Sequence, residues 1–427
     1  MKVLVVGSGA REHALCWKLS AEPETEVICA PGNGGIAALV RCLPVDVNDA
    51  ASILALVEAE AVDLTVIGPE APLAAGAVDL LTSRGRRVFG PTARAAQLET
   101  SKAFAKDFMQ RHGVPTARYR VCASAEEALS VVRGGELGDR LVVKADGLAA
   151  GKGVVVADDA AMAEAAIEAA MVARVFGAAG ARIVLEERLS GPEVSFFVLT
   201  DGRRALPLPS AQDHKRALDG DRGPNTGGMG AFAPSPLLST ALHARVMREI
   251  VEPVVAGMAA EGTPFCGFLY CGLMLTADGP KVIEFNVRFG DPEAQVVLPM
   301  IDEPLAPLLW SASAGELTAA ECRVDGDARV GVVLASKGYP ANVETGQVIR
   351  GLERVARDCA DVLVFHAGTR DAAAGLVTAG GRVLTVVGRG ATYEAAIARA
   401  YDAVARLSFD GMQVRRDIGR SALAAPR

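Results

Sequence analysis

At 427 residues the chain is longer than one hydrophobic core usually serves, so we expect two to four domains. A net charge of −7 argues against a protein built around nucleic acid, and no apolar run is long enough to predict a membrane span. The eight cysteines form no Cys-x-x-Cys pair and do not cluster with the histidines, which disfavours a disulfide framework or a zinc site and favours a cytoplasmic protein.

The first hundred residues alternate short apolar strands with helical patterns. This alternation is typical of a parallel sheet with helices on both faces, and it predicts a Rossmann-like domain over residues 1–100. Ligands bind such sheets at the carboxyl ends of the strands. The predicted strands cover residues 3–6, 27–30, 64–67 and 87–89, and the predicted helices cover residues 12–19 and 51–60.

The loop after the first strand, Gly7-Ser8-Gly9-Ala10-Arg11-Glu12, resembles a dinucleotide-binding loop but lacks its full pattern. The fingerprint Gly-x-Gly-x-x-Gly needs a glycine where this chain has Glu12, and the second strand ends in Pro31 rather than in an acid for a ribose hydroxyl. We therefore reject a dinucleotide site. An anion site at the start of a helix and a purely structural turn both stay open.

A helical stretch at residues 93–111 leads into a compact unit at about residues 119–189. Lys144 ends a predicted strand, and Lys152 lies in the turn Gly151-Lys152-Gly153 before the next strand. Glycines let backbone N–H groups approach phosphate oxygens, and lysines add positive charge. We predict a hairpin flap over a triphosphate, with an ordinary glycine hairpin as the alternative. The unit is expected to contain strands at residues 141–144, 154–156 and 183–185 and a helix at residues 160–172.

Residues 185–193 form a short, charged connection between predicted strands. Such a linker between two lobes can present backbone donors and acceptors to an adenine edge, and a nearby acid can bind ribose hydroxyls. A plain charged turn is the other interpretation. Further strands are expected at residues 195–199 and 268–275, and a helix at residues 241–259.

Residues 212–216 and 223–230 are polar and glycine-rich within an otherwise apolar region. A polar loop of this length is usually functional or disordered. His214 by itself does not indicate a catalytic base, because its charged neighbours make a binding or positioning role equally consistent.

Glu284 and Asn286 lie two residues apart in a predicted strand, so both oxygen-bearing side chains point to one face. A carboxylate and an amide oxygen suit a hard cation such as Mg²⁺. Arg288 continues that face and can bind a phosphate or carboxylate with both guanidinium nitrogens. This pattern predicts phosphate chemistry, with a solvated polar edge strand as the alternative.

From residue 329 onward the composition changes to hairpin-like strands and one helix, which predicts a small C-terminal α+β domain at residues 329–427. The middle segment is then residues 101–328. The strands are expected at residues 330–334, 362–366 and 383–387, and the helix at residues 392–406.

Taken together, these motifs resemble the ATP-grasp superfamily and, within it, the glycinamide ribonucleotide synthetase (phosphoribosylamine–glycine ligase) family along the whole chain. The resemblance implies an α/β and α+β multidomain protein with an ATP-grasp core between the two terminal domains. The matching segments are residues 7–14, 68–72, 101–104, 144–153, 212–216, 223–230, 284–293 and 366–369. Ser8 and Ala10 depart mildly from the family's usual Gly-Asn-Gly-Gly-Arg-Glu-His loop.

The resemblance also implies roles for individual residues. ATP would be bound by Lys106, Lys144, Gly151, Lys152, Gly153, Glu186, Glu187, Leu189 and Glu193. Glu284 and Asn286 would hold Mg²⁺ or Mn²⁺, and Arg288, Lys144 and Asp213 would serve catalysis. Glycine and 5-phosphoribosylamine would be bound by Gly9, Asn33, Glu70, Asp213, His214, Lys215, Asn225, Thr226, Gly227, Gly228, Met229, Arg288, Gly290 and Asp291. The strand at residues 268–275 carries no acid, although many ATP-grasp enzymes have a metal-binding acid there.

The implied reaction is the ATP-dependent ligation of glycine to 5-phosphoribosylamine through glycyl phosphate in purine synthesis. The implied partners are only these small molecules, without nucleic acid or membrane, and we expect a cytoplasmic monomer. One rival is a carboxylase of the same superfamily that activates bicarbonate. A rival of another class is a non-catalytic nucleotide sensor, which would be free to lose residues such as Lys144 and Glu284.

Overall fold

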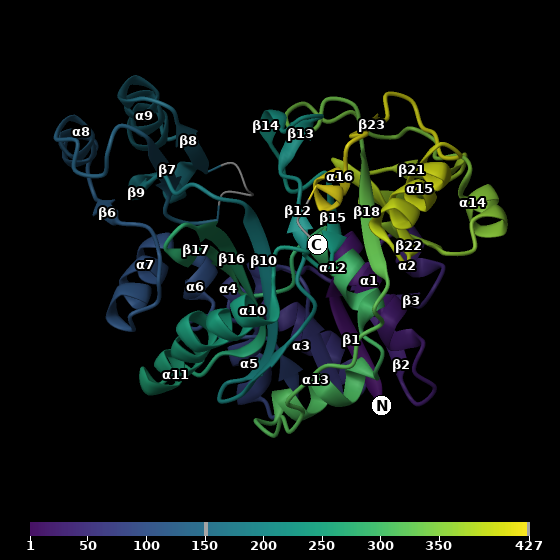
Figure 1. The fold of residues 1–427 in the computed structure, drawn as a ribbon. Helices are drawn as coiled ribbons and strands as arrows, with labels where there is room; N and C mark the ends of the chain where they lie inside the picture. Colours follow the sequence, from purple (N-terminus) through teal and green to yellow (C-terminus); the bar gives the residue numbers. More distant parts are fainter. Residues whose placement is uncertain (149–152, 425–427) are drawn as a thin grey trace.

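The computed structural model describes residues 1–148 and 153–424, in which four sheets of four or more strands carry the fold. In Figure 1 the flap elements lie at upper left and the C-terminal elements at right, with β10, β16 and β17 between them and the N-terminal sheet below. None of the helices within the described ranges combines the length and the apolar character needed to cross a bilayer.

The N-terminal sheet is parallel, with strand order β3-β2-β1-β4-β5, which confirms the predicted Rossmann-like sheet. Successive residues of β1 pack into two different cores, because a strand buried on both faces needs apolar side chains on each. The elements are β1 (Lys2–Gly7), α1 (Ala10–Ser20), β2 (Glu26–Pro31), α2 (Gly34–Ala37), β3 (Arg41–Cys42), α3 (Ala50–Ala59), β4 (Leu64–Ile67), α4 (Glu70–Ala74), α5 (Ala77–Ser83) and β5 (Val88–Phe89).

The helical stretch predicted at residues 93–111 is two helices, α6 (Gln97–Thr100) and α7 (Lys102–Arg111). Ser101 between them has extended backbone, and its hydroxyl accepts a hydrogen bond from the Phe104 N–H at 3.1 Å. The single-helix prediction was wrong because Ser101 acts as an N-cap, and an N-cap residue has non-helical backbone angles.

The flap unit is an antiparallel sheet with order β6-β9-β7-β8, covered by α8 and α9. Its own apolar cluster is separate from the other cores. The helix predicted at residues 160–172 ends sooner, and its last part winds as a π-helix at Glu168–Val172. The elements are β6 (Tyr119–Cys122), α8 (Ala125–Arg133), β7 (Leu141–Ala145), β8 (Val154–Ala157), α9 (Ala160–Ile167) and β9 (Ile183–Glu187).

The central sheet is also antiparallel, with order β11-β10-β16-β17. It places Glu284 opposite Gly272 and Asn286 opposite Tyr270, so the strand next to β17 offers no carboxylate at these positions. The helix predicted at residues 241–259 is interrupted by a π-helical turn at Met247–Val251. The elements are β10 (Glu193–Asp201), β11 (Ala205–Pro207), α10 (Thr240–Val246), α11 (Glu252–Ala260), β16 (Cys266–Thr276), β17 (Gly279–Asn286), α12 (Glu293–Val297) and α13 (Leu305–Ser313).

The C-terminal sheet has order β12-β15-β18-β22-β19, and β23 also pairs with β18. It crosses the boundary expected at residues 328/329, because β12 and β15 come from the middle segment. The polar stretch at residues 223–230 is therefore partly strand rather than one long loop. The elements are β12 (Gln212–Asp213), β13 (Arg216–Leu218), β14 (Arg222–Asn225), β15 (Gly230–Ala233), β18 (Ala328–Ala335), α14 (Leu352–Asp358), β19 (Val362–His366), β20 (Thr369–Ala372), β21 (Gly375–Thr378), β22 (Arg382–Gly390), α15 (Tyr393–Val404), β23 (Gln413–Val414) and α16 (Arg420–Leu423).

Candidate active site

A cavity of about 360 Å³ opens at the carboxyl ends of β1 and β2. The loops after these strands meet residues from the middle and C-terminal segments there, although the three are far apart in the sequence. The lining includes Ser8, Gly9, Asn33, Asp291, Thr369 and Arg382.

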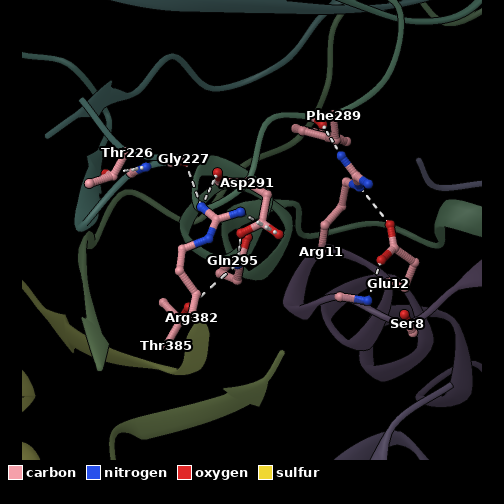
Figure 2. Close-up of polar contacts among 12 residues, drawn as sticks. Ser8, Arg11, Glu12, Thr226, Gly227, Phe289, Asp291, Gln295, Arg382 and Thr385 are labelled. Carbon is pink, nitrogen blue, oxygen red and sulfur yellow. Dashed lines mark hydrogen bonds and ion pairs between the residues drawn. The ribbon is translucent and has the colours of Figure 1, made fainter. Parts of the chain in front are cut away.

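The first loop of this cavity is closed to a dinucleotide by Glu12. The Glu12 carboxylate accepts a hydrogen bond from the Gly9 N–H at 2.6 Å and another from Arg11 Nε at 2.6 Å. Arg11 also donates to the Phe289 carbonyl at 3.2 Å (Figure 2). The N–H that a pyrophosphate would need is thus already bound inside the protein, which agrees with the incomplete fingerprint.

Asn33 also lies in the cavity wall, but its side chain is fully used within the protein. Its amide nitrogen donates to the carbonyls of Ser8 and His366, both at 2.8 Å, and its oxygen caps α2. His366 N–H in turn donates to His13 Nδ1 at 2.9 Å. Asn33 therefore fixes the loops around the cavity rather than offering a free amide to a ligand.

The second candidate site lies where the flap sheet meets the central sheet, and we call it the cleft; Lys106 and Lys144 meet at Glu186 there. The carboxylate oxygens of Glu186 lie 2.9 Å from Lys106 Nζ and 2.8 Å from Lys144 Nζ, and all three side chains are buried. Lys144 also donates to the Ile283 carbonyl at 2.8 Å. The structure thus brings two of the predicted phosphate-binding lysines together next to β17.

Electrostatics in this cleft keep Glu186 ionised. Burial alone would raise the pKa of Glu186, but Lys144 and Lys106 more than offset it and hold that pKa below its usual value. Burial lowers the pKa of Lys106 to about 8. Both lysines therefore have a carboxylate of the protein itself as their partner.

The other predicted nucleotide residues lie along the rim of this cleft. Glu187 points away from the lysines to Arg118, with 2.7 Å between Oε2 and Nε, as expected for alternating residues of a strand. Leu189 lies in the connection to β10, and exposed Glu193 pairs with Lys215 at 3.1 Å. Gly153 accepts a hydrogen bond from the Ala145 N–H through its carbonyl. Gly151 and Lys152 lie outside the described residues.

Glu284 and Asn286 share a face of β17 at the inner end of the cleft. Burial would raise the pKa of Glu284, but Lys215, Lys144, Lys102 and Arg288 lower it overall, so the carboxylate stays ionised. Hydrogen bonding orients the Asn286 amide so that its nitrogen donates to Glu99 Oε1 at 3.0 Å. The amide oxygen is then left for a cation.

Arg288 lies between two carboxylates just beyond the end of β17. Its nitrogens lie 2.7 Å from Glu99 Oε1 and 3.1 Å from Glu70 Oε2. Burial would lower the pKa of Arg288, but Glu99 and Glu70 hold it above its usual value. Glu70 therefore pairs with Arg288, and the charge of the guanidinium is balanced by two carboxylates of the protein itself.

Lys215 is the cation of an acidic cluster that also contains Asp213, Glu193, Glu284 and Glu293. Burial is the largest cause that raises the pKa of Asp213 to about 7, and repulsion from Glu293, Glu193 and Glu284 adds to it while Lys215 opposes it. Negative charge is thus in excess around one lysine. A divalent cation at Glu284 would relieve this excess, so the donor set fits a hard metal ion.

The structure does not bring His214 into this cluster. His214 follows the end of β12 and packs against Phe232, with 5.9 Å between ring centroids, and burial lowers its pKa to about 4. Asn225 lines a separate apolar cavity beside Val155 on the flap, and Met229 is buried. Thr226, Gly227, Gly228, Gly290 and Asp291 form the wall between the cleft and the first cavity.

Two further charged residues of the site were given no role in the sequence analysis, although Lys102 lies in the matching segment 101–104. Glu99 holds both Asn286 and Arg288, and Lys102 donates to the Gly147 carbonyl at 3.2 Å at the base of the flap. The matching segment itself could have indicated Lys102, whereas only proximity to that segment could have indicated Glu99. Among residues 1–148 and 153–424, no group of three or more His, Cys, Asp or Glu is arranged to hold a metal by itself.

Comparison with known proteins assigns all three segments to one family. The descriptions "Phosphoribosylglycinamide synthetase" N domain, ATP-grasp (A) domain and C domain match residues 1–99, 100–294 and 329–421. The phosphoribosylamine–glycine ligase of Xylella fastidiosa is 53% identical over 99% of this chain and 98% of its own length. That of Vibrio cholerae is 48% identical over 99% of each.

Solved structures give the same result. The crystal structure of phosphoribosylamine–glycine ligase from Thermotoga maritima superposes with a TM-score of 0.85 at 33% identity, covering 98% of this chain and 100% of that one. A biotin carboxylase from Campylobacter jejuni reaches a TM-score of 0.75 at 17% identity, covering 100% and 95%, which shows a shared fold alone. The chain belongs to the phosphoribosylglycinamide synthetase family.

Proposed function

We propose that this chain ligates glycine to 5-phosphoribosylamine with ATP, giving glycinamide ribonucleotide, ADP and phosphate in de novo purine synthesis. Membership of the family makes the chain an ATP-dependent ligase. The observation that carries the proposal is the adjacency of the two sites. A Cβ atom built on Gly9 in the cavity would lie 3.4 Å from Asp291, three residues after Arg288 of the cleft.

We assign the nucleotide to the cleft between the flap and central sheets. Lys106 and Lys144 would exchange Glu186 for triphosphate oxygens, with residues 151–153 covering them. The side chains of Glu186 and Glu187 already have partners, and the N–H groups of Glu187 and Arg188 donate to the Arg118 and Arg140 carbonyls, so we assign the adenine edge to Leu189 of this connection. Glu193 would serve the ribose.

We assign the divalent metal, Mg²⁺ or Mn²⁺, to Glu284 and Asn286. One carboxylate and one amide oxygen suit a metal whose remaining ligands are phosphate oxygens and water. When bound, the metal neutralises charge that develops on the transferred phosphoryl group. The amide nitrogen of Asn286 donates to Glu99 Oε1, which leaves the amide oxygen available to the metal.

We assign glycine activation to the wall between cleft and cavity. The glycine carboxylate would attack the γ-phosphate to give glycyl phosphate, and the amine of phosphoribosylamine would then displace phosphate. Arg288 and Lys215 would hold the acyl phosphate, and Asp213, Gly290 and Asp291 would position the glycine, whose ammonium group attracts carboxylates. No protein nucleophile is needed, because positioning and charge neutralisation supply the rate.

We assign phosphoribosylamine to the cavity of about 360 Å³ at Gly9 and Asn33. Small residues line this cavity and leave room for a phosphorylated sugar beside the Ser8 and Thr369 hydroxyls, while many of the lining N–H groups already donate within the protein. Glu70 would act through Arg288, because a carboxylate repels a phosphate. The segments 1–100, 101–328 and 329–427, a monomeric state and a cytoplasmic location complete the proposal, and the family descriptions for the three segments support the division.

The test is phosphate release that depends on ATP, glycine and phosphoribosylamine together. We expect release with all three substrates and formation of glycinamide ribonucleotide in equal amount. Release that depends on bicarbonate instead of glycine would replace the proposal with the carboxylase alternative. No turnover with either acid would favour the nucleotide sensor.

A further inference from the structure

Arg382, the first residue of β22, reaches from the C-terminal sheet to two loops of the middle segment. Its Nη1 donates to the carbonyls of Gly227 and Asp291, both at 2.6 Å, and its Nη2 lies 3.3 Å from the Asp291 carboxylate. Figure 2 shows the guanidinium between these two partners. Among the described residues that line the cavity, Arg382 is also the only lysine or arginine.

The Gly227 peptide is bound from both sides by the C-terminal segment. Arg382 donates to the Gly227 carbonyl, and the Gly227 N–H donates to the Tyr339 hydroxyl at 3.0 Å. A Cβ atom built on Gly227 would lie 3.1 Å from Arg382 Cζ, so any side chain here would crowd the guanidinium. The position of this loop therefore depends on Arg382.

The Asp291 carboxylate is likewise bound at both of its oxygens. Arg382 lies at one carboxylate oxygen, and buried Gln295 donates to the other at 2.7 Å. The loops of Gly228 and Pro292 touch, because a Cβ atom built on Gly228 would lie 2.4 Å from Pro292 Cδ. The two loops thus form one wall, and Arg382 binds both halves of it.

This wall continues into the cleft on the far side. The Thr226 hydroxyl donates to the Lys215 carbonyl at 2.8 Å, and Lys215 Nζ lies 3.6 Å from the Glu284 carboxylate. A continuous series of contacts therefore runs from the cavity, through Arg382 and the Gly227 loop, to the residue assigned to the metal.

We propose that Arg382 is a positioning residue that aligns the amine in the cavity with the acyl phosphate in the cleft. The inference rests on the proposed function. In the aligned state, the C–N bond forms as the C–O bond to phosphate breaks, and one amine proton leaves with the phosphate. When the wall shifts, water attacks the same carbon, and glycine and phosphate are released with one ATP consumed and no product.

The experiment measures ADP formed per glycinamide ribonucleotide formed, with Arg382→Ala, Arg382→Lys and the unchanged protein. We expect a ratio near one for the unchanged protein. For Arg382→Ala we expect product turnover to fall about tenfold or more, the ratio to rise clearly above one, and the KM for ATP to stay within about twofold. Added guanidinium ion should restore part of the coupling in Arg382→Ala, whereas Arg382→Lys should not, because an ammonium cannot bridge the two carbonyls and the carboxylate together.

The matched control is Arg389→Ala, on the same strand but paired with Asp327 at the surface, which should leave the ratio at one. An unchanged ratio in Arg382→Ala, whether turnover holds or falls, would overturn the inference. So would a loss of turnover accompanied by an equal loss of ATP binding and thermal stability. Failure of the unchanged protein to make the ribonucleotide would instead refute the proposed function.

Discussion

The cleft around Lys144 and the cavity around Gly9 are built in opposite ways. The cleft is made of charged side chains that pair with one another, such as Glu186 between two lysines. The cavity is made mainly of backbone and small residues contributed by three distant segments. A ligand in the cleft must therefore replace ion pairs, whereas a ligand in the cavity depends on how accurately the loops are placed.

The strongest test of the cleft is Glu284→Gln. We expect ligase turnover to fall about a thousandfold, or about 4 kcal/mol, because the amide removes the one carboxylate assigned to the metal. Phosphate release at saturating substrates measures this effect, and circular dichroism checks that the fold remains. Asp278→Asn, in the turn of the same hairpin, should behave like the unchanged protein. Near-normal turnover of Glu284→Gln at limiting Mg²⁺ would break the metal assignment.

Glu186→Gln tests whether the cleft is held together by charge. We expect the free energy of unfolding to fall by about 3 kcal/mol, because two buried lysines would lose their shared partner. Denaturant unfolding measures the loss, and ATP should restore part of it by supplying phosphate oxygens. Glu187→Gln is the matched comparison, since its partner Arg118 is exposed and the loss should stay below about 1 kcal/mol. Equal losses of unfolding free energy in Glu186→Gln and Glu187→Gln would show that the buried ion pairs do not hold the cleft together.

The free energy of unfolding should depend on pH through His13, which binds the His366 N–H next to the cavity. Burial, followed by His366, lowers the pKa of His13 to about 3. The unfolded chain takes up this proton near pH 6.5 and the folded chain does not, so the stabilising contribution is complete above that pH and is lost as the pH falls. At pH 5 the loss is about 2 kcal/mol.

Urea unfolding at pH 7.5 and pH 5 measures this loss. His13→Asn keeps an acceptor for the His366 N–H but does not titrate, so its stability should change less between the two values. Identical changes in the variant and the unchanged protein would show that His13 does not carry the effect.

The smallest expected effect concerns Glu99, where the two regions meet. Glu99→Gln should lower kcat about tenfold with little change in the KM for ATP, because an amide cannot accept from both Arg288 and the Val287 N–H. Steady-state kinetics measure kcat and the KM for ATP separately. Gln97→Ala on the same short helix should have no effect, and a raised KM for ATP with unchanged kcat would move Glu99 from the acyl-phosphate side to the nucleotide.

The cleft was largely predictable from the sequence, whereas the cavity was predictable only in part: Gly9, Asn33 and Asp291 were expected to bind substrate, but Arg382 was not. Glu284 and Asn286 share a strand, and two-residue periodicity alone places them on one face. Lys144 was indicated by the glycines that follow it. Arg382 carried no comparable signal, because its partners lie about 90 and 155 residues away and their approach depends on tertiary packing.

The details of the fold that the sequence did not predict are those that a local pattern leaves ambiguous or that depend on packing. The parallel N-terminal sheet followed from the alternation of apolar strands and helices. The break at Ser101 did not, because one serine inside a helical pattern can act either as a cap or as an ordinary helical residue. The pairing of β15 with β18, which brings β12 into the same sheet, was likewise not predicted, since strand register across long distances is set by packing.

That last pairing has a consequence for the order in which the chain can assemble. Gly230 of β15 lies opposite Val332 of β18, and β12 beyond it carries Asp213. During synthesis the middle segment leaves the ribosome well before β18 does. Its flap and central sheet can form early. The strand β15, which pairs with β12 and so positions Asp213, has no partner on its other edge until β18 has emerged, about a hundred residues later. We therefore expect a nascent chain halted before β18 to bind nucleotide without performing ligation.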